Sequence, residues 1–404
     1  MKRYRASWVL PISEPPIRDG WIAVDHDRVV ATGRRSANRS EPEIDLGNVA
    51  VMPGLVNAHT HLELSYLREE IPPAPTFVAW VRKVIAASRR RSDPKAPHIL
   101  DAVERGIAES VASGTAVVGD ISNTLATFDA IARSPLAGIV FYELIRFNAP
   151  EPEALVDQAV SQIAELAGTD RVRASLAAHA TYSVAPLVFR AIRNAVNTEP
   201  FRPFSVHLSE SAEEMEFIRD GAGPWRTVLE EIGAWDPAWV PPGGTPVKFL
   251  HDCGFLDGRL LAVHGVQMND DDLRRLVEHD VTLVTCPRSN GHTGAGAPPI
   301  ADFYRSGVHV AVGTDSLASS PDLSVFAEIA TMRALAPSVP ASALLESATR
   351  IGARALGFDA DYGTIEAGRR ARLLLVDLPA GTGDVEEYLV SGIQPEQIRW
   401  LSPE

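Results

Sequence analysis

Two histidines one residue apart are the first feature of this chain that could do chemistry. His59 and His61 follow an apolar run and a Pro53-Gly54 turn within the segment 51–63. Side chains in a β-strand alternate between its two faces, so both imidazoles would point the same way at the end of one strand. Two ligands of one metal ion need this arrangement, although a buried strand can carry such a pair by chance. The pair therefore becomes informative only if other strand ends supply further ligands.

Similar side chains do close later apolar segments. His207 ends the segment that starts at Phe204, His264 ends another, and Asp315 follows a third. Three imidazoles and one carboxylate from this set suit Zn²⁺ or Fe²⁺ with a position left open for water. A single histidine of this kind is usually a hydrogen-bonded core residue. Five matches at the ends of strand-like segments favour a metal site instead.

The elements that would hold these residues alternate between short apolar strands and helical periods, the pattern of repeated βα units around a parallel sheet. Eight strands are expected to end near His61, Asp120, Glu143, His179, His207, His264, Arg288 and Asp315. Eight units over about 300 residues predict an α/β fold of the (β/α)₈ barrel type, in which the C-terminal strand ends share one mouth. A doubly wound open sheet is the alternative, but no Gly-x-Gly-x-x-Gly follows the first strand.

Both ends of the chain are rich in strand-like segments too short to bury a core alone. We expect residues 1–52 and 360–404 to pair into one small β-sandwich domain, and residues 53–359 to form the barrel. The Pro-, Gly- and Trp-rich insertion Gly233–Thr245 is interpreted as a lid or packing loop. Gly291–Gly296 lacks a phosphate-binding Gly-Lys-Ser/Thr and is interpreted as a mobile loop.

Composition excludes several classes of function. The net charge of −14 over 404 residues argues against binding to nucleic acid or anionic membranes. No apolar stretch is long enough for a membrane span or a signal core. The two cysteines, Cys253 and Cys286, fit a reducing compartment. We therefore expect a cytoplasmic protein that acts on a small molecule, as a homo-oligomer and most simply a dimer.

These motifs together resemble the amidohydrolase superfamily, in its branch of amino-heterocycle deaminases and chlorohydrolases. The resemblance implies one catalytic metal held by His59, His61, His207 and Asp315, with Glu210 as proton shuttle and His264 orienting the attacking water. The motifs that carry it are PGLVNAHTH at 53–61, His-x-x-Glu at 207–210, His-Gly at 264–265, TCPRSN at 285–290, GTDS at 313–316 and the paired chain ends. The unrelated zinc deaminases with a Pro-Cys-x-x-Cys motif are excluded, because Cys286 precedes its proline and no second cysteine follows.

The lysines bear on the number of metal ions. Members of the superfamily with two metals bridge them with a carboxylated lysine, or sometimes a glutamate, from a middle strand. None of the four lysines, at positions 2, 83, 95 and 248, stands at an expected strand end, which favours one metal. Glu143, at the end of the third strand, keeps the two-metal alternative open.

Substrate contacts are expected from six residues at or near the mouth. Arg146, His179 and Arg288 could pair with a substrate carboxylate or polar group, or with local partners. Glu63 and Glu143 could bind ribose hydroxyls or those arginines. Trp80 could cover a flat ring or pack in the core.

Several local runs are similar to aminodeoxyfutalosine deaminases of menaquinone biosynthesis, which convert an adenine nucleoside carrying a benzoate to its inosine analogue. The runs are HTHLELS at 59–65, Phe-Tyr-Glu at 141–143, 207–216 and CPRSN at 286–290. Deaminases of S-adenosylhomocysteine or adenosine are the near alternative. A hydrolase of a ring chloride or cyclic amide is a second alternative. A non-catalytic relative is the third, but such a protein should lack some of the ligands, the glutamate or the orienting histidine, and none of these is missing here.

Overall fold

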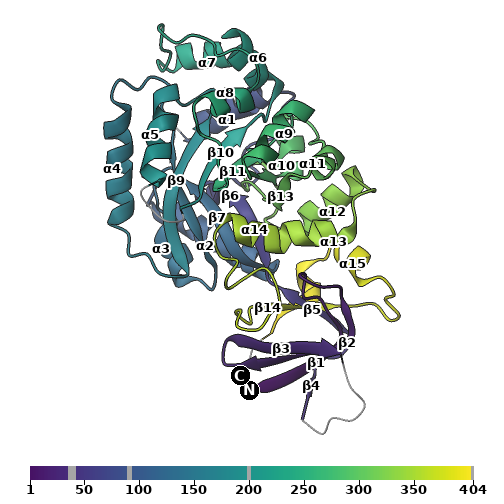
Figure 1. Ribbon diagram of the computed structural model, residues 1–404. Helices are drawn as coiled ribbons and strands as arrows, with labels where there is room; N and C mark the ends of the chain where they lie inside the picture. The colour runs from purple at the N-terminus through teal and green to yellow at the C-terminus, as the bar shows by residue number, and fades with distance from the viewer. Residues whose placement is uncertain (35–41, 89–92, 198–201, 402–404) are drawn as a thin grey trace.

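The computed structural model describes residues 1–34, 42–88, 93–197 and 202–401, which form an eight-stranded parallel sheet and a second sheet beyond one of its ends (Figure 1). The eight strands follow one another in sequence order. The first and last meet through a bridge between Thr60 and Asp315. This nearly closed barrel confirms the (β/α)₈ expectation. Its strands are β6 (Leu55–Thr60), β7 (Thr115–Ser122), β8 (Ala137–Leu144), β9 (Val172–Ala180), β10 (Phe204–Leu208), β11 (Leu260–His264), β12 (Thr282–Thr285) and β13 (His309–Val312).

Continuous burial explains why these segments form the barrel. Every residue of β6, β7, β10 and β11 is buried, as expected of parallel strands covered on both faces. The helices between them supply the outer cover. They are η1 (Leu62–Leu67), α1 (Phe77–Ser88), α2 (Pro97–Ala112), α3 (Phe128–Arg133), α4 (Pro152–Ala164), α5 (Pro186–Val196), α6 (Ala212–Asp220), α7 (Pro224–Glu231), α8 (Pro246–Asp252), α9 (Asp270–Glu278), α10 (Pro287–Thr293), α11 (Ile300–Ser306), α12 (Val325–Leu335), α13 (Ala341–Glu346), η2 (Ser347–Ile351) and α14 (Gly352–Ala355).

The second sheet comes from both chain ends, as expected, in the order β15-β14-β5-β1-β2-β3 with β4 paired to β1. Its core includes Tyr4, Ile22, Val51 and Leu373. The division of the chain into two domains at residues 53 and 360 stays a prediction. The elements of this part are β1 (Lys2–Val9), β2 (Ile17–Asp25), β3 (Arg28–Arg34), β4 (Ile44–Asp45), β5 (Val49–Pro53), β14 (Leu373–Asp377), α15 (Val385–Leu389), η3 (Pro395–Gln397) and β15 (Ile398–Trp400).

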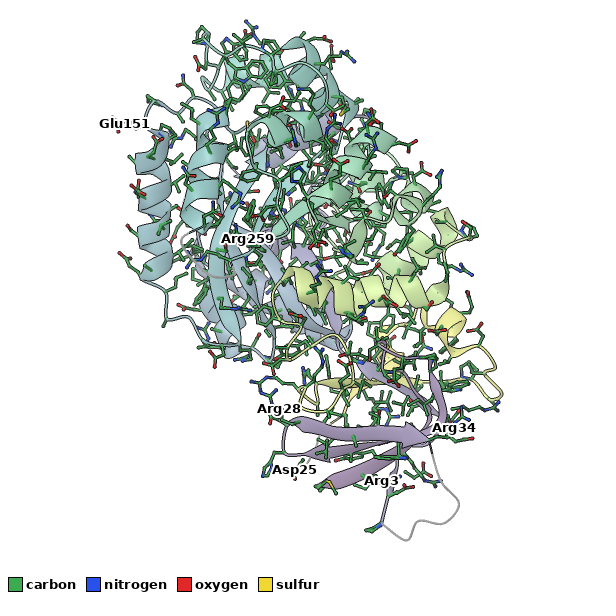
Figure 2. All side chains as sticks on the ribbon, viewed as in Figure 1. Arg3, Asp25, Arg28, Arg34, Glu151 and Arg259 are labelled. Atoms are coloured by element: carbon green, nitrogen blue, oxygen red, sulfur yellow. The ribbon has the colours of Figure 1, made fainter. Side chains whose placement is uncertain are left out.

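One glycine connects the two sheets. Gly54 separates β5, in the end sheet, from β6, in the barrel. A Cβ atom at this position would lie 2.5 Å from the Cβ of Ala116, so only glycine fits. The ion pair between Arg28 of the end sheet and Asp361 ties this sheet to the segment that follows α14. Figure 2 labels Arg28 on that sheet, whereas Glu151 and Arg259 lie on the barrel.

The insertion Gly233–Thr245 packs over the barrel near α6, α7 and α8, which lie at the end opposite the second sheet (Figure 1). Trp235 stacks on Phe147 and Trp239 stacks on Phe217, at centroid distances of 5.7 and 4.8 Å. The insertion is therefore an anchored packing loop.

The expectation of a loop at Gly291–Gly296 is wrong for residues 291–293, which belong to α10, whereas residues 294–296 lie outside any helix. Gly291 continues α10, which ends at Gly294 in a left-handed conformation. Among the described residues, none of the helices has the length and apolar character that crossing a bilayer requires.

Candidate metal-dependent active site

Nitrogen atoms of three histidines and one carboxylate oxygen converge at the mouth of the barrel. Nε2 of His61 lies 3.2 Å from Nε2 of His59 and 3.4 Å from Nε2 of His207. Oδ1 of Asp315 lies 3.5 Å from Nε2 of His61 and 4.0 Å from Nε2 of His59. Ligands held tetrahedrally at about 2.0–2.1 Å from zinc lie about 3.3–3.4 Å apart. The four side chains thus have the spacing of a metal-ligand cluster.

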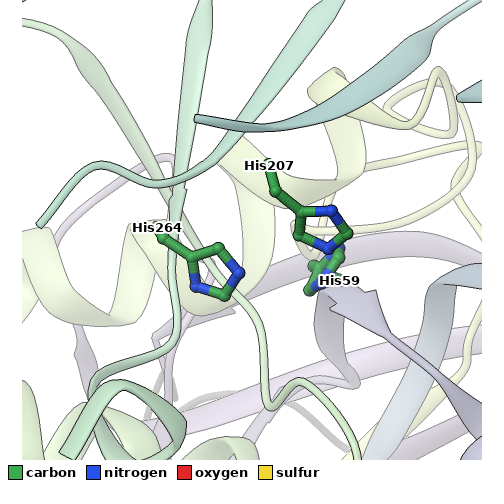
Figure 3. Close-up of side chains that lie close together, drawn as sticks. All are labelled: His59, His207 and His264. Carbon is green, nitrogen blue, oxygen red and sulfur yellow. The ribbon is translucent and has the colours of Figure 1, made fainter. Parts of the chain in front are cut away.

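A fourth imidazole stands beside this cluster. Figure 3 shows His264, from the end of β11, next to the rings of His59 and His207. Its ring centroid lies 5.7 Å from that of His59 and 5.3 Å from that of His207. His264 and Asp315 adopt φ angles of +82° and +57°. Such left-handed backbone costs about 1–3 kcal/mol in residues other than glycine and is common at functional sites.

The pKa shifts of the clustered side chains favour the binding of a cation. Burial lowers the pKa of His59 well below its usual value and that of His61 to about 3, and repulsion between the imidazoles adds to the shift. Burial alone would raise the pKa of Asp315, but His61 and His264 hold it below its usual value. Nδ1 of His207 bonds to the backbone oxygen of His179 at 2.8 Å, which directs Nε2 toward the cluster. Neutral imidazoles with an ionised carboxylate are the protonation state that binds a metal.

Glu210 lies on the loop between β10 and α6, with Oε1 3.6 Å from Nε2 of His264. Burial raises the pKa of Glu210 well above its usual value, and the charges of Asp315 and Glu214 raise it further. Its backbone N–H donates a 2.8 Å hydrogen bond to Glu214, whose other oxygen accepts one of 2.6 Å from Thr181. Glu214 therefore fixes the loop that carries Glu210.

Helix α10 supplies two contacts to which sequence analysis assigned no role. Ser289 Oγ donates a 2.5 Å hydrogen bond to Oδ2 of Asp315. Nδ2 of Asn290 lies 3.0 Å from Nδ1 of His264. Both polar side chains are fully buried. Their place in the TCPRSN motif at 285–290 was the available signal.

A cavity of about 850 Å³ opens beside the cluster. His61, His207, Glu210, His264 and Asp315 line its deep end, and apolar side chains of α1 and α7 form much of its wall. Trp80 lines the cavity, as sequence analysis allowed. Two unexpected residues, Tyr182 and Trp225, stack at 3.7 Å with 12° between their planes. This wall can enclose a flat, largely apolar ligand.

Two residues expected at the mouth do not line the cavity. Oε2 of Glu63 accepts hydrogen bonds from Ser122 Oγ at 2.5 Å and from the backbone N–H of Asn123 at 3.0 Å. Arg288 lies in α10, and its guanidinium makes two 2.8 Å hydrogen bonds to the Asp322 carboxylate. The charged groups of Glu63 and Arg288, which were expected to bind the substrate, are therefore bound to neighbouring residues instead.

Arg146, Glu143 and His179 do line the cavity. Arg146 is exposed, and among the described residues no carboxylate forms an ion pair with it. Oε2 of Glu143 accepts a 2.8 Å hydrogen bond from Asn123, whereas its buried Oε1 has no hydrogen-bond partner in the described part of the chain. Arg146 and Glu143 can therefore still bind polar groups of a ligand.

Glu143, His179 and His207 form a second group of potential ligand atoms. However, Nδ1 of His207, which lies 3.5 Å from Glu143, already bonds to the backbone of His179. None of the four lysines ends a barrel strand. The geometry thus favours one metal site over two.

Comparison with known proteins agrees with this site. Residues 50–397 match the amidohydrolase family. A 5-methylthioadenosine/S-adenosylhomocysteine deaminase of Moorella thermoacetica is 30% identical over 385 residues, covering 92% of this chain and 84% of the relative. An aminodeoxyfutalosine deaminase of Deinococcus radiodurans is 29% identical over 354 residues, covering 84% and 81%. The crystal structure of an adenosine deaminase from Xanthomonas campestris with bound zinc matches with a TM-score of 0.83 and 26% identity, over 98% of this chain and 90% of that chain. The motifs, the barrel and these matches together establish that the chain belongs to the amidohydrolase family.

Proposed function

We propose that this protein is a hydrolytic deaminase that replaces the ring amino group of an adenine nucleoside by oxygen and releases ammonia. The observation that carries the proposal is the position of Glu210, a buried carboxyl group beside both the ligand cluster and the cavity. A carboxyl group at this position can carry a proton to a ring nitrogen of a ligand in the cavity. The names of the Moorella, Deinococcus and Xanthomonas relatives support an adenine nucleoside as the substrate.

His59, His61, His207 and Asp315 are the proposed metal ligands. A divalent metal held there would supply a bound water whose pKa lies far below that of bulk water. We propose zinc, because this ligand set suits it and the Xanthomonas structure contains it; ferrous iron is the alternative. Elemental analysis of the purified protein distinguishes the two metals.

The protons are moved by side chains of the chain. Asp315 accepts one proton from the attacking water as the water oxygen bonds to C6 of the adenine, and Glu210 gives its proton to the neighbouring ring nitrogen N1. In the second half, the proton on Asp315 passes to the amino group and the C6–N bond breaks. The hydroxyl proton on C6 then returns to Glu210. One water is consumed and one ammonia is released, while both carboxyl groups regain their starting states.

We propose 6-amino-6-deoxyfutalosine, an intermediate of menaquinone biosynthesis, as the substrate. The aromatic cavity wall, the unpaired Arg146 and the Deinococcus relative support it. The second candidate is a 5-methylthioadenosine/S-adenosylhomocysteine deaminase, because the Moorella relative reaches 30% identity. Ammonia release from these nucleosides and from adenosine tests the proposal. Halide release or opening of a cyclic amide, without ammonia from any nucleoside, would contradict it.

We also propose that the protein acts in the cytoplasm as a homodimer. Both Cys253 and Cys286 are free thiols, which suits a reducing compartment. Sedimentation velocity at micromolar concentration tests the dimer, and a purely monomeric species would contradict it.

A further inference from the structure

We infer that Asn290 fixes the tautomer of His264, so that His264 presents Nε2–H to the active site as a hydrogen-bond donor and does not act there as a base. Asn290 is then a positioning residue that acts through His264. The choice of amide orientation and the kinetic part of the inference rest on the proposed deaminase activity, whereas the tautomer can be measured independently of it.

The contact between the two side chains has a direction. Nδ2 of Asn290 lies 3.0 Å from Nδ1 of His264. An amide nitrogen can only donate, so in this orientation of the amide Nδ1 accepts and carries no proton. A neutral imidazole then has its single proton on Nε2. The side chains of Asn290 and His264 are 0% and 1% exposed, so water does not compete for this hydrogen bond.

The backbone around Asn290 is fixed by its own hydrogen bonds. The backbone N–H of Asn290 donates to the backbone oxygen of Cys286 at 3.0 Å. The backbone oxygen of Asn290 accepts a hydrogen bond from the N–H of Ala295 at 3.1 Å. Rotation of the amide about its terminal bond is the remaining freedom. It would exchange Oδ1 and Nδ2. In either orientation one amide atom has no partner among the described residues, and in the structure that atom is Oδ1.

The chemistry of Glu210 selects between the two orientations. Oε1 of Glu210 lies 3.6 Å from Nε2 of His264. An unprotonated Nε2 would compete for the proton that Glu210 must give to the substrate. A protonated Nε2 cannot take that proton, and it stabilises the carboxylate formed when the proton leaves. His264 therefore assists by donation, and the proton of the attacking water goes to Asp315.

Two variants separate these orientations. Asn290→Asp keeps the shape but offers only acceptors, which places the proton of His264 on Nδ1. Asn290→Ala removes the partner without imposing a tautomer. We expect Asn290→Asp to lose roughly a hundredfold in kcat, more than Asn290→Ala, with little change in KM. Near-wild-type kcat in Asn290→Asp, with the larger loss in Asn290→Ala, would overturn the inference. Metal content and Tm are compared for each variant.

Nitrogen NMR tests the tautomer without turnover. In zinc-loaded protein labelled with ¹⁵N-histidine, the Nδ1 signal of His264 should have the shift of an unprotonated ring nitrogen and Nε2 that of a protonated one. The His264→Gln variant assigns the signals. A protonated Nδ1 would overturn the inference whichever reaction the protein catalyses, and failure of the deaminase assay would leave this result unaffected. If Asn290→Asp does not fold, the nitrogen shifts of His264 in the wild-type protein test the inference alone.

Discussion

Ser289 donates its hydroxyl hydrogen to Oδ2 of Asp315, leaving Oδ1 as the carboxylate oxygen that faces the histidine nitrogens. The same hydroxyl lies 2.9 Å from Oγ of Ser319, so it has polar neighbours on two sides. Groups of this kind fix the direction in which a ligand offers its lone pair, and their loss typically weakens metal binding by about 10- to 100-fold.

The first prediction is that Ser289→Ala lowers metal affinity by about 10- to 100-fold without unfolding the protein. Competition with a coloured chelator measures the affinity. Ser161→Ala is the matched control, because in the described part of the chain Ser161 Oγ donates to the backbone of its own helix, at 2.9 Å from the oxygen of Asp157. Equal affinities in the two variants would show that the contact with Asp315 does not orient a ligand.

Removal of a ligand should have a larger effect. His61→Ala or Asp315→Ala should abolish activity and lower the bound metal well below one per chain, because three ligands remain in a site spaced for four. Elemental analysis and ammonia release measure both effects. Full metal content and turnover in either variant would refute the assignment, and two tightly bound metals in the wild type would refute the single site.

Glu210→Gln should separate proton transfer from metal binding. Glutamine keeps the shape of the side chain but cannot carry a proton, so we expect wild-type metal content with a rate loss of roughly a hundredfold or more. The exposed Glu278 of α9 provides the control variant Glu278→Gln. Unchanged turnover in Glu210→Gln would remove Glu210 from the mechanism.

Arg146 is predicted to select substrates with a carboxylate beyond the ribose. A charge-assisted hydrogen bond contributes about 1.5–3 kcal/mol, and the exposure of Arg146 places it at the lower end. We expect kcat/KM for a carboxylate-bearing adenosine analogue to exceed that for adenosine by about tenfold, and Arg146→Met to erase the margin.

Arg288→Met is the contrast in this experiment. Since Arg288 pairs with Asp322, its loss should lower Tm and keep the preference for the carboxylate. An equal kcat/KM for both substrates in the wild type would reject carboxylate recognition.

Glu328 should make stability depend on pH. Burial raises the pKa of Glu328 to about 8 from 4.5, even though Arg288 lies 3.7 Å away. A raised folded-state pKa favours the protonated form, so its stabilisation is full below about pH 4.5 and is lost as pH rises through about 8. Glu328→Gln does not titrate, so its Tm should fall less than that of the wild type between about pH 6 and pH 8. An equal fall of Tm in the variant and the wild type over this pH range would contradict the prediction.

The barrel and the place of the candidate ligands at its strand ends could be predicted because each is a local signal repeated along the chain. His59, His207 and His264 lie on strands at or near their ends, where an apolar run stops. Arg288 was misplaced because β12 ends at Thr285 and Pro287 begins a helix. A proline in the first turn was the overlooked signal.

Other parts of the site depend on contacts between segments far apart in sequence. Tyr182 and Trp225 meet only because α7 folds back across the end of the barrel, and no spacing in the sequence records that path. The partners of Glu63 likewise come from the last residue of β7 and the loop after it. The contacts of such residues can be found only in the three-dimensional structure.

Closure of the barrel sets the order in which a newly made chain can acquire its metal. The backbone oxygen of His59 accepts hydrogen bonds from Thr314 at 3.0 Å and Asp315 at 3.1 Å, and Thr60 bonds to Asp315 across 255 positions. A chain still on the ribosome and shorter than this has its first histidines and the β7 partner of β6, but neither the contact that closes the barrel on the other side of β6 nor the carboxylate. The ligands made earliest must therefore wait for one of the last barrel segments, and metal loading follows translation of the barrel.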